Sequence, residues 1–549
     1  MLLTEVIVGD VRPILLVLWT ATGLLLLIAS VNVAGLLLLR SEGRRREIAV
    51  RSGLGASGAR LLCQFATEGV VLVAAGCATG LFGALWTMQL LASLIPKDMR
   101  PYVPFLQSLG FNSHVLAFAG TVAVLAALLF TVIPGSRVGS NLRNGLAEAG
   151  HRSAATVWSR LGANLIVLEL ATAVILLVAA GLLGKSLYRI LNVNLGMRPE
   201  HLATMRVNAP QALYNNKEKS AALGRDVVRS VSSLPGVESA GLTSRLPVEG
   251  GNTVWIRVIG RPYGGEHNEV AFRRVTPAYF TTLRASLVRG RCFNEADDAS
   301  RPRVIIIDQH FARQYFPGED PIGQKIARTH GTELQPMEIV GVVADIREGP
   351  LDKATWPTMY YAFNQDPTTY FSLVVRTSQK EDSVFQAAAS AIRQVSPALS
   401  ISEPISMSDR ISHSPAAYIR RSAASLVAGF AVLALLLGIV GLYGVIAYSV
   451  GQRTREIGVR IALGAPPGTV YGLILRQAGQ LIGIGLIVGL ATAVGAAGFM
   501  RSLLFGVQNW DMETLVSVAV LLATAGLVAS FFPARHAATV NPVDALRAE

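Results

Sequence analysis

Two pairs of oppositely charged residues have a spacing that suits an ion pair. Glu47 precedes Arg51 by four positions, and Glu456 precedes Arg460 by the same distance. Residues four apart share one face of a helix, and an acidic residue on the N-terminal side gives the more favourable pair. Such a pair carries out no bond chemistry. It suits a short surface helix that binds another protein.

The sequence around each pair repeats as well. The apolar positions and a closing glycine recur at matching places: Ile48, Val50, Leu54 and Gly55 in the first copy, and Ile457, Val459, Leu463 and Gly464 in the second. The pattern predicts a short amphipathic helix at a membrane surface that ends at the glycine. Two interpretations remain open. One is a basic loop that only fixes topology, and the other is a docking helix.

One segment has a superficial likeness to a phosphate-binding loop. Residues 181–186 read Gly-Leu-Leu-Gly-Lys-Ser, but the first glycine of that motif would fall on Ala179. The segment also lies in an apolar stretch with no strand before it. The eight histidines form no zinc-binding pattern, and no nucleophile elbow occurs. We therefore predict no enzyme activity, no catalytic residue, no cofactor and no metal site.

The composition is that of a membrane protein. Hydrophobic residues make up 51% of the 549 residues, charged residues only 15%, and the mean hydropathy is +0.44. About 25% of the residues of soluble domains are charged. Stretches long enough to cross a bilayer fall at about 14–39, 65–92, 114–134, 161–188, 421–448, 473–497 and 513–532.

The basic residues predict the orientation of these seven spans. Arginines concentrate in the short loops 40–64, 135–160 and 449–472. The loops 93–113 and 498–512 carry fewer. The positive-inside rule places the arginine-rich loops in the cytoplasm. The C-terminus is then inside, and the N-terminus and the long segment 189–420 are outside. This topology also accounts for the net charge of +13 without a nucleic-acid partner.

The chain contains an internal repeat. Residues 46–51 read Arg-Glu-Ile-Ala-Val-Arg and residues 455–460 read Arg-Glu-Ile-Gly-Val-Arg, at an offset of 409. Each segment lies between two spans and is followed by Leu-Gly-Ala. Residues 14–137 and 421–535 are therefore two copies of a three-span unit. The repeated motif resembles that of the FtsX-like permease family, which includes the MacB-type and lipoprotein-release ABC permeases.

The resemblance extends to the long outer segment. Residues 196–202 look like the family's entry into its extracytoplasmic domain, and residues 320–323 and 338–343 give further matches. The resemblance implies the permease subunit of an ABC transporter in a bacterial plasma membrane, which transmits the movement of a separate cytoplasmic ATPase to the outer domain for export. A periplasmic adaptor or a second permease chain is a further candidate partner. The alternative is a signalling or scaffold protein that regulates an extracytoplasmic partner.

The residues that the resemblance assigns to ATPase coupling are those of the two repeated loops: Arg46, Glu47, Ile48, Val50, Arg51, Leu54, Gly55, Arg455, Glu456, Ile457, Val459, Arg460, Leu463 and Gly464. The expected domains are a first three-span unit, a cytoplasmic linker, a membrane helix, an outer domain and a second three-span unit: 1–137, 138–160, 161–191, 192–418 and 419–549. Because each half of the family begins with a span and an outer domain, we expect a truncated N-terminal half or a natural seven-span variant.

The outer segment predicts an α+β domain. Strands are expected at 202–207, 237–242, 371–375 and 399–405, with helices at 216–234 and 381–395. Two βαβ-like units thus flank a strand-rich centre, in which 304–307 and 338–343 are candidates for buried strands. Glu295, Asp297 and Asp298 indicate a solvated turn, with a weak cation site as the alternative. The predicted fold is a membrane α-helical protein of seven spans with an α+β extracytoplasmic domain.

A few further residues lie within the spans. Glu169 is an intramembrane carboxylate, which is a candidate functional group by default, although it could also snorkel or pair with a nearby arginine. The glycine pairs Gly76 with Gly80 and Gly485 with Gly489 have the spacing that lets helices approach closely. The three cysteines show no pair with disulfide or metal spacing.

Overall fold

The computed structural model describes residues 12–43, 58–93, 113, 115–125, 151–262, 264–266, 268–329 and 335–539. The chain divides into two compact units. A helical unit comprises residues 1–182, 425–502 and 508–549, and a mixed unit comprises residues 183–424 and 503–507. The residues of the first repeated loop, from Arg46 to Gly55, lie outside the described part, as do residues 126–150.

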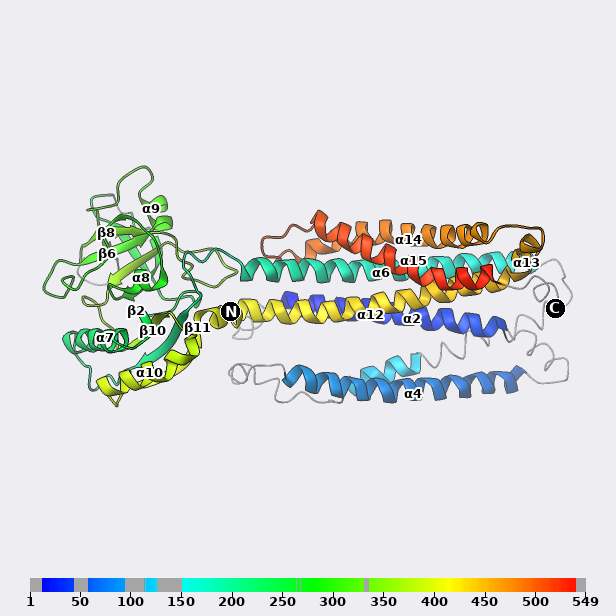
Figure 1. The fold of residues 1–549 in the computed structure, drawn as a ribbon, viewed down its shortest axis with the longest axis horizontal. Helices are drawn as coiled ribbons and strands as arrows, with labels where there is room; N and C mark the ends of the chain where they lie inside the picture. Colours follow the sequence, from blue (N-terminus) through cyan, green and yellow to red (C-terminus); the bar gives the residue numbers. More distant parts are fainter. Residues whose placement is uncertain are drawn as a thin grey trace. The chain divides into compact units, whose positions relative to one another are not determined.

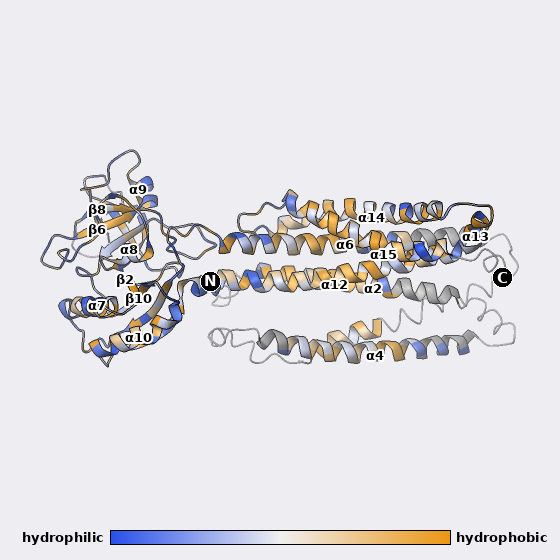
Figure 2. Cartoon of the chain, viewed as in Figure 1, coloured by the Kyte–Doolittle hydropathy of each residue, from blue (hydrophilic) through white to orange (hydrophobic). Residues whose placement is uncertain are grey.

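Among the described residues, six helices are long and apolar enough to cross a membrane. They are α2 (Arg12–Gly43), α4 (Gly58–Ser93), α6 (His151–Leu191), α12 (Pro415–Gln452), α14 (Pro467–Ala497) and α15 (Met512–Ala538). Figure 2 colours much of the visible side of α12, α14 and α15 hydrophobic, in keeping with the apolar stretches of these helices. Of the predicted span 114–134, the structure describes an apolar helix only from Val115 to Leu125. Seven spans are therefore not shown.

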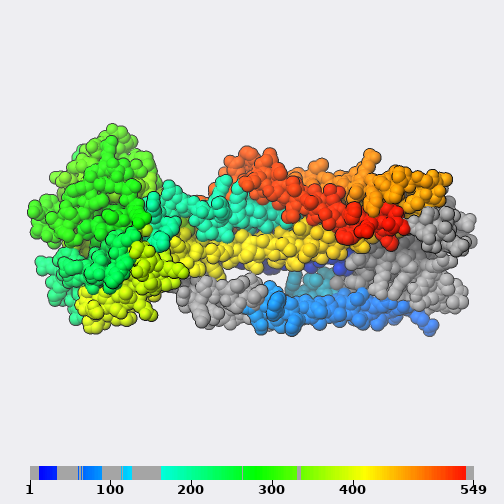
Figure 3. All heavy atoms as spheres, in the orientation of Figure 1, coloured from blue at the N-terminus to red at the C-terminus, as the bar shows by residue number. Residues whose placement is uncertain are grey.

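Small residues let α14 approach its neighbours. A Cβ at Gly485 would lie 2.8 Å from the Cβ of Leu170, and one at Gly489 would lie 2.7 Å from the Cβ of Val174, so both glycines pack against α6. The prediction for this pair is confirmed. The helices α14 and α15 lie side by side along the chain's orange and red surface in Figure 3. By contrast, Gly76 and Gly80 meet nothing within 4 Å among the described residues.

The mixed unit is built on one sheet of eleven strands. Its first part consists of β1 (Leu202–Asn208), β2 (Val237–Thr243), β10 (Tyr370–Thr377) and β11 (Ser400–Ser406), in the order β11-β1-β10-β2. The helices α7 (Lys217–Ser232) and α10 (Glu381–Val395) lie side by side against these strands, as Figure 1 shows. Apolar side chains of both helices and of the inner sheet face form one core there.

The second part is a closed ring of six strands. The order β4-β3-β7-β8-β6-β9 returns to its start because β9 also pairs with β4, in parallel. The strands are β3 (Thr253–Val258), β4 (Asn268–Val275), β6 (Val304–Asp308), β7 (Lys325–Arg328), β8 (Met337–Val343) and β9 (Thr358–Ala362). The short strand β5 (Leu287–Gly290) pairs with β8 outside the ring. The helix α9 (Gln309–Tyr315) packs against β6, β8 and β9 of the ring, whereas α8 (Tyr279–Leu283) packs against β2 and β10 of the first part.

The predicted elements of the outer segment are confirmed with small shifts at their ends. The helix expected at 381–395 has those bounds, and the strand expected at 202–207 ends one residue later. The two βαβ-like units, however, form one continuous sheet, since β1 of the first unit lies between β10 and β11 of the second. Strands far apart in the sequence pair there, which local patterning does not reveal.

Candidate functional site

The second repeated loop forms a short helix, α13 (Thr454–Ala462), between α12 and α14. It begins directly after α12, and the amide of Ile457 donates a hydrogen bond to the carbonyl of Arg453 at 2.9 Å. Glu456 lies in the first turn and Arg460 in the last turn. This charge order is favourable with the helix dipole. The helix predicted for this loop is therefore confirmed. The side chain of Arg455 lies outside the described part of the structure.

Glu456 and Arg460 form the expected ion pair on α13. Nη2 of Arg460 donates to Oε1 of Glu456 at 2.6 Å. The two side chains remain 54% and 50% exposed. An exposed pair at this spacing contributes only about 0.3–0.5 kcal/mol to stability. The pair is therefore a poor explanation for the fold of the loop, and both charged groups are accessible to another molecule.

The apolar residues of the second loop differ in their burial. Ile457 is 3% exposed and packs into the protein, whereas Val459 is 40% and Leu463 is 82% exposed. Residues two positions apart point to different sides of a helix, so Val459 cannot follow Ile457 into the interior. One apolar residue thus anchors the helix, and two others are presented to the surroundings.

Gly464 ends the helix as predicted. Its φ of +89° is left-handed, a conformation that costs glycine little because it lacks a Cβ. The amide of Gly464 donates to the carbonyl of Ile461, and the amide of Ala465 donates to that of Arg460, both at 3.0 Å. This hydrogen-bond pair is the Schellman arrangement, which satisfies the last carbonyls of a helix. The turn fixes the direction in which the chain continues to α14.

The seven coupling residues of the first loop cannot be compared with this geometry. Arg46, Glu47, Ile48, Val50, Arg51, Leu54 and Gly55 all lie outside the described residues. Of the two loops, the structure therefore describes the coupling residues of the second one only.

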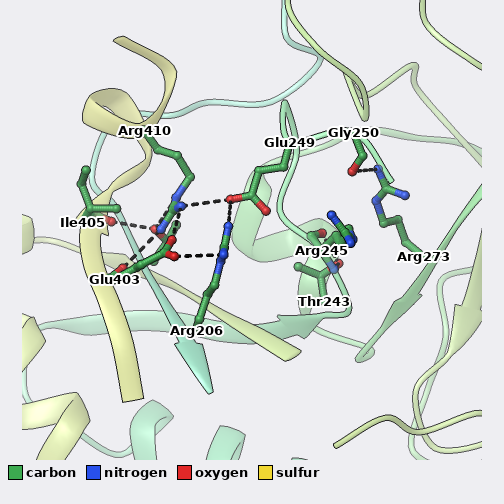
Figure 4. A network of polar contacts seen from close by, with 10 residues as sticks. Arg206, Thr243, Arg245, Glu249, Gly250, Arg273, Glu403, Ile405 and Arg410 are labelled. Carbon is green, nitrogen blue, oxygen red and sulfur yellow. Dashed lines mark hydrogen bonds and ion pairs between the residues drawn. The ribbon is translucent and has the colours of Figure 1, made fainter. Parts of the chain in front are cut away.

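A charge-balanced network lies in the mixed unit and was not anticipated from the sequence. Arg206 contacts Glu249 at 3.0 Å and Glu403 at 2.9 Å, and Arg410 contacts the same two carboxylates at 2.9 and 3.0 Å. Figure 4 shows the four side chains interleaved. Burial alone would lower the pKa of Arg206, but the two glutamates raise it above its usual value. The two positive and the two negative charges balance one another. The contacts hold together the segments of the chain that carry Arg206, Glu249 and the pair of Glu403 and Arg410.

A second charged pair is fully buried. Nε of Arg273 donates to Oε2 of Glu348 at 3.0 Å, and the hydroxyl of Tyr360 donates to Oε1 of the same carboxylate at 3.0 Å. Burial raises the pKa of Glu348, although Arg273 and Tyr360 act against this shift. The carboxylate has both oxygens occupied by neighbours. The pair is also shielded from solvent, with side chains 0% and 2% exposed, so it serves as a structural group.

The acidic residues near position 297 are also satisfied by neighbours. Arg291 donates two hydrogen bonds to Asp297, at 2.8 and 2.9 Å, and Asp298 accepts two from the amide and the hydroxyl of Ser300. Glu295 accepts one from Asn364. Asp297 is 6% exposed, so the solvated turn that the sequence indicates is wrong for this residue. Within the described ranges, no group of three or more His, Cys, Asp and Glu side chains could hold a metal ion.

The segment 181–186 lies inside α6 and is helical throughout. The hydroxyl of Ser186 accepts a hydrogen bond from the amide of Phe505 at 2.8 Å. A helix has no loop amides free to surround a phosphate. The prediction that this segment is no nucleotide-binding loop is confirmed.

Comparisons with known families match both units. The profile described as "MacB-like periplasmic core domain" matches residues 165–395. The profile described as "FtsX-like permease C-terminal" matches twice, over 19–141 and 428–542. The double match confirms the internal repeat. No ATPase domain is found in the chain, which is a permease chain.

Similar proteins include permeases and ATP-binding permeases. The chain is 28% identical over 301 residues to the "Uncharacterized ABC transporter permease YknZ" of Bacillus subtilis, covering 52% of this chain and 72% of YknZ. It is 27% identical over 286 residues to the "Macrolide export ATP-binding/permease protein MacB" of Chromobacterium violaceum, covering 49% of this chain and 42% of that protein. It is 26% identical over 382 residues to the "Pyoverdine export ATP-binding/permease protein PvdT" of Pseudomonas aeruginosa, covering 65% and 54%.

The chain thus spans about half of the length of the two ATP-binding relatives. Among solved structures, the periplasmic region of MacB from Actinobacillus actinomycetemcomitans matches 41% of this chain and 95% of its own, at 14% identity and a TM-score of 0.28. The extracellular domain of YknZ matches 36% of this chain and 100% of its own, at 18% identity and a TM-score of 0.26. On its sequence profiles, the chain is a multi-pass FtsX-like permease with a MacB-like periplasmic core domain, related to the MacB- and YknZ-type ABC transporter permeases.

Proposed function

We propose that the chain is the permease of an export complex in a bacterial plasma membrane, and that a separate cytoplasmic ABC ATPase binds α13 and the matching loop 46–55. The observation that carries the proposal is the exposed ion pair of Glu456 and Arg460, on a helix that joins two membrane helices. Relatives named for export of macrolides and pyoverdine support the export direction.

The attachment of α13 favours transmission of movement. Only Arg453 separates α13 from α12, and four residues, 463–466, separate it from α14. Gly464 and the two hydrogen bonds of its turn hold one end, while buried Ile457 holds the middle. A helix fixed at these points moves with its neighbours when it is pushed. A flexible loop would absorb the same displacement.

The exposed side of α13 suits a protein partner. Leu463 presents an apolar side chain beside the two charged groups. Apolar residues at the centre of an interface and charged residues at its rim are the usual arrangement. A loop that served topology alone would need only positive charge, so a conserved order of Glu and Arg within this one chain's repeat favours docking.

From α13 the movement would reach the outer domain through α12. The helices α6 and α12 are those that flank the extracytoplasmic segment in the sequence. We propose domain boundaries at 1–137, 138–160, 161–191, 192–418 and 419–549, with the outer domain contacting cargo or an adaptor.

The test is co-purification of the ATPase with charge-reversed chains. The wild-type chain is expected to bring down an ABC ATPase, and the double variant Glu456→Arg with Arg460→Glu is expected to lose most of it, because the pair can still form within α13 but presents the opposite charges. The single variant Arg501→Gln, in the opposite loop, serves as control. Full retention of the ATPase by the double variant would overturn the proposal.

A further inference from the structure

The sheet of the mixed unit splits where β2 ends. The last residue pair between β10 and β2 joins Ser372 to Thr243, and β2 meets β4 at a single pair, Thr243 with Val275. Beyond these pairs β10 and β4 are no longer joined by a common neighbour. A space is therefore left between the two strands.

This space is a pocket of about 130 Å³. Its lining comes from the chain after β2, from β4 and from the start of β10: Ser244, Arg245, Asn252, Phe272, Arg274, Thr368 and Tyr370. Pockets for whole drug-sized ligands measure about 300–1,000 Å³. The space is therefore large enough for one group of a ligand, with the remainder of the molecule outside.

Two arginines, Arg245 and Arg274, are among the residues that line the pocket, whereas none of the lining residues is acidic. The surrounding charges, which lie outside this lining, are also mostly positive. Nε of Arg274 contacts Asp366 at 2.9 Å, and the same carboxylate also pairs with Arg328 at 3.3 Å and with Lys217 at 3.7 Å. One negative charge thus serves three positive ones. Arg245 adds a fourth positive charge. Its side chain is exposed, and in the described part of the chain its guanidinium has no hydrogen bond or ion pair.

Aromatic rings lie beside these charges. The guanidinium groups of Arg274 and Arg328 lie 5.3 and 5.7 Å from the ring centre of Phe272. Tyr370 contributes a second ring that is 42% exposed. Flat arginine and aromatic surfaces bind flat ligand rings by stacking. Ser244 and Thr368 contribute hydroxyl groups, and Asn252 an amide, which can orient a polar substituent.

We propose that this pocket binds the carboxylate end of a small aromatic acid, with Arg245 as its ion partner and Phe272 and Tyr370 against its ring. An anion balances the excess of positive side chains. The two parallel N–H donors of a guanidinium also match the two oxygens of a carboxylate. The charge-balanced network of Arg206 and Arg410 is a poor site for the same ligand, because its glutamates already occupy both arginines.

The inference goes beyond the proposed function and is independent of it. Binding at this pocket needs neither nucleotide nor the ATPase, so it can be measured on the purified permease alone. Failure of ligand binding would leave the docking role of α13 untouched, and failure of ATPase docking would leave the pocket untouched.

The test is a fluorine NMR titration of 4-fluorobenzoate with the full chain in nanodiscs, with empty nanodiscs subtracted. The neutral probe 4-fluorobenzamide has the same shape without the charge. Arg245→Gln removes the unpaired cation, and Arg245→Lys keeps the charge without the fork. The matched control is Arg393→Gln, which removes one exposed charge from α10 in the same unit.

We expect binding of 4-fluorobenzoate by the wild type and by Arg393→Gln, and little binding of the amide. Arg245→Gln is expected to weaken binding by about tenfold or more, the usual effect of losing a charged hydrogen bond, and Arg245→Lys to recover part of it. Equal binding of acid and amide, or no change in Arg245→Gln, would overturn the proposal. Absence of binding to the wild type, or binding of an acidic peptide in place of the benzoate, would also overturn it.

Discussion

The amide of Asn32 joins three helices of the helical unit through Glu169. Nδ2 of Asn32 donates to Oε1 of Glu169 at 2.5 Å and to the carbonyl of Leu437 at 3.1 Å. Glu169 is 2% exposed. The contact links α2 of the first repeat with α6 and with α12 of the second repeat. The partner of Glu169 is thus the amide of Asn32 on another helix. It is not the nearby arginine that was one alternative expected from the sequence.

Removal of the polar group at position 169 is expected to loosen these helices. In Glu169→Leu the amide of Asn32 loses its acceptor inside an apolar bundle, which costs about 1–2 kcal/mol. Glu169→Gln keeps an acceptor oxygen and is expected to lose much less. Thermal unfolding of the detergent-purified chain measures both variants. Equal melting temperatures of Glu169→Leu and the wild type would show that the contact contributes nothing to stability.

Gly441 provides the space for this contact. A Cβ at that position would lie close to Oε2 of Glu169 and 2.6 Å from Oδ1 of Asn32. Gly441→Ala is therefore expected to displace the pair and lower the melting temperature, by an amount typical of overpacking, about 1–3 kcal/mol. Gly438 meets only a methyl group of Leu170, at 3.7 Å, so Gly438→Ala is the matched control and is expected to behave like the wild type.

The turn after α13 is expected to depend on glycine. At φ +89° an alanine at position 464 is strained, by roughly 1 kcal/mol. No neighbouring atom lies within 4 Å of a Cβ there, so the effect is one of backbone conformation alone. Gly464→Ala should weaken ATPase co-purification, while Gly464→Asn, which tolerates this conformation better, should retain more of it. If both variants bring down the same amount of ATPase, the geometry of this turn does not affect docking.

The pair of Arg291 and Asp297 makes the mixed unit sensitive to acid. Burial would raise the pKa of Asp297, but the hydrogen bonds and charge of Arg291 hold it below its usual value. A lowered pKa in the folded state stabilises the protein above the unfolded pKa, near 3.9, and this stability is lost as the pH falls through the folded value. Asp297→Asn should therefore lower the melting temperature at pH 7 but little at strongly acid pH.

The variant Asp226→Asn is the control for this effect. Asp226 also pairs with an arginine, Arg229 at 3.0 Å, but the two side chains are 51% and 76% exposed, and exposed pairs contribute little to stability. Its replacement should change the melting temperature little at any pH. A pH-independent difference between Asp297→Asn and the wild type would show that packing, and not charge, accounts for the loss.

The sequence predicts the parts of this fold that depend on local pattern. The alternation in 202–207 and the amphipathic run of 381–395 depend on neighbours within one element, and both elements occur as expected. Glu456, Arg460 and Gly464 also follow local helix rules, so their pair and turn could be predicted. Val459 does not share the buried side of Ile457, because residues two positions apart point to different sides of a helix.

The remaining features depend on pairings between distant parts of the chain. The insertion of β1 between β10 and β11, the pocket beside Arg245, and the contact of Asn32 with Glu169 join residues that are more than a hundred positions apart. The network of Arg206 and Arg410 is of the same kind. Nothing in the local spacing of these residues indicates their partners.

The docking role of α13 is tested most directly by photocross-linking in whole cells. A benzophenone-bearing amino acid at position 463, where Leu463 is 82% exposed, is expected to cross-link to a cytoplasmic ABC ATPase. The same amino acid at position 499, where Phe499 is 90% exposed after α14, is expected to give no such product. A cross-link to the ATPase from position 499, or none from position 463, would contradict the docking role of α13.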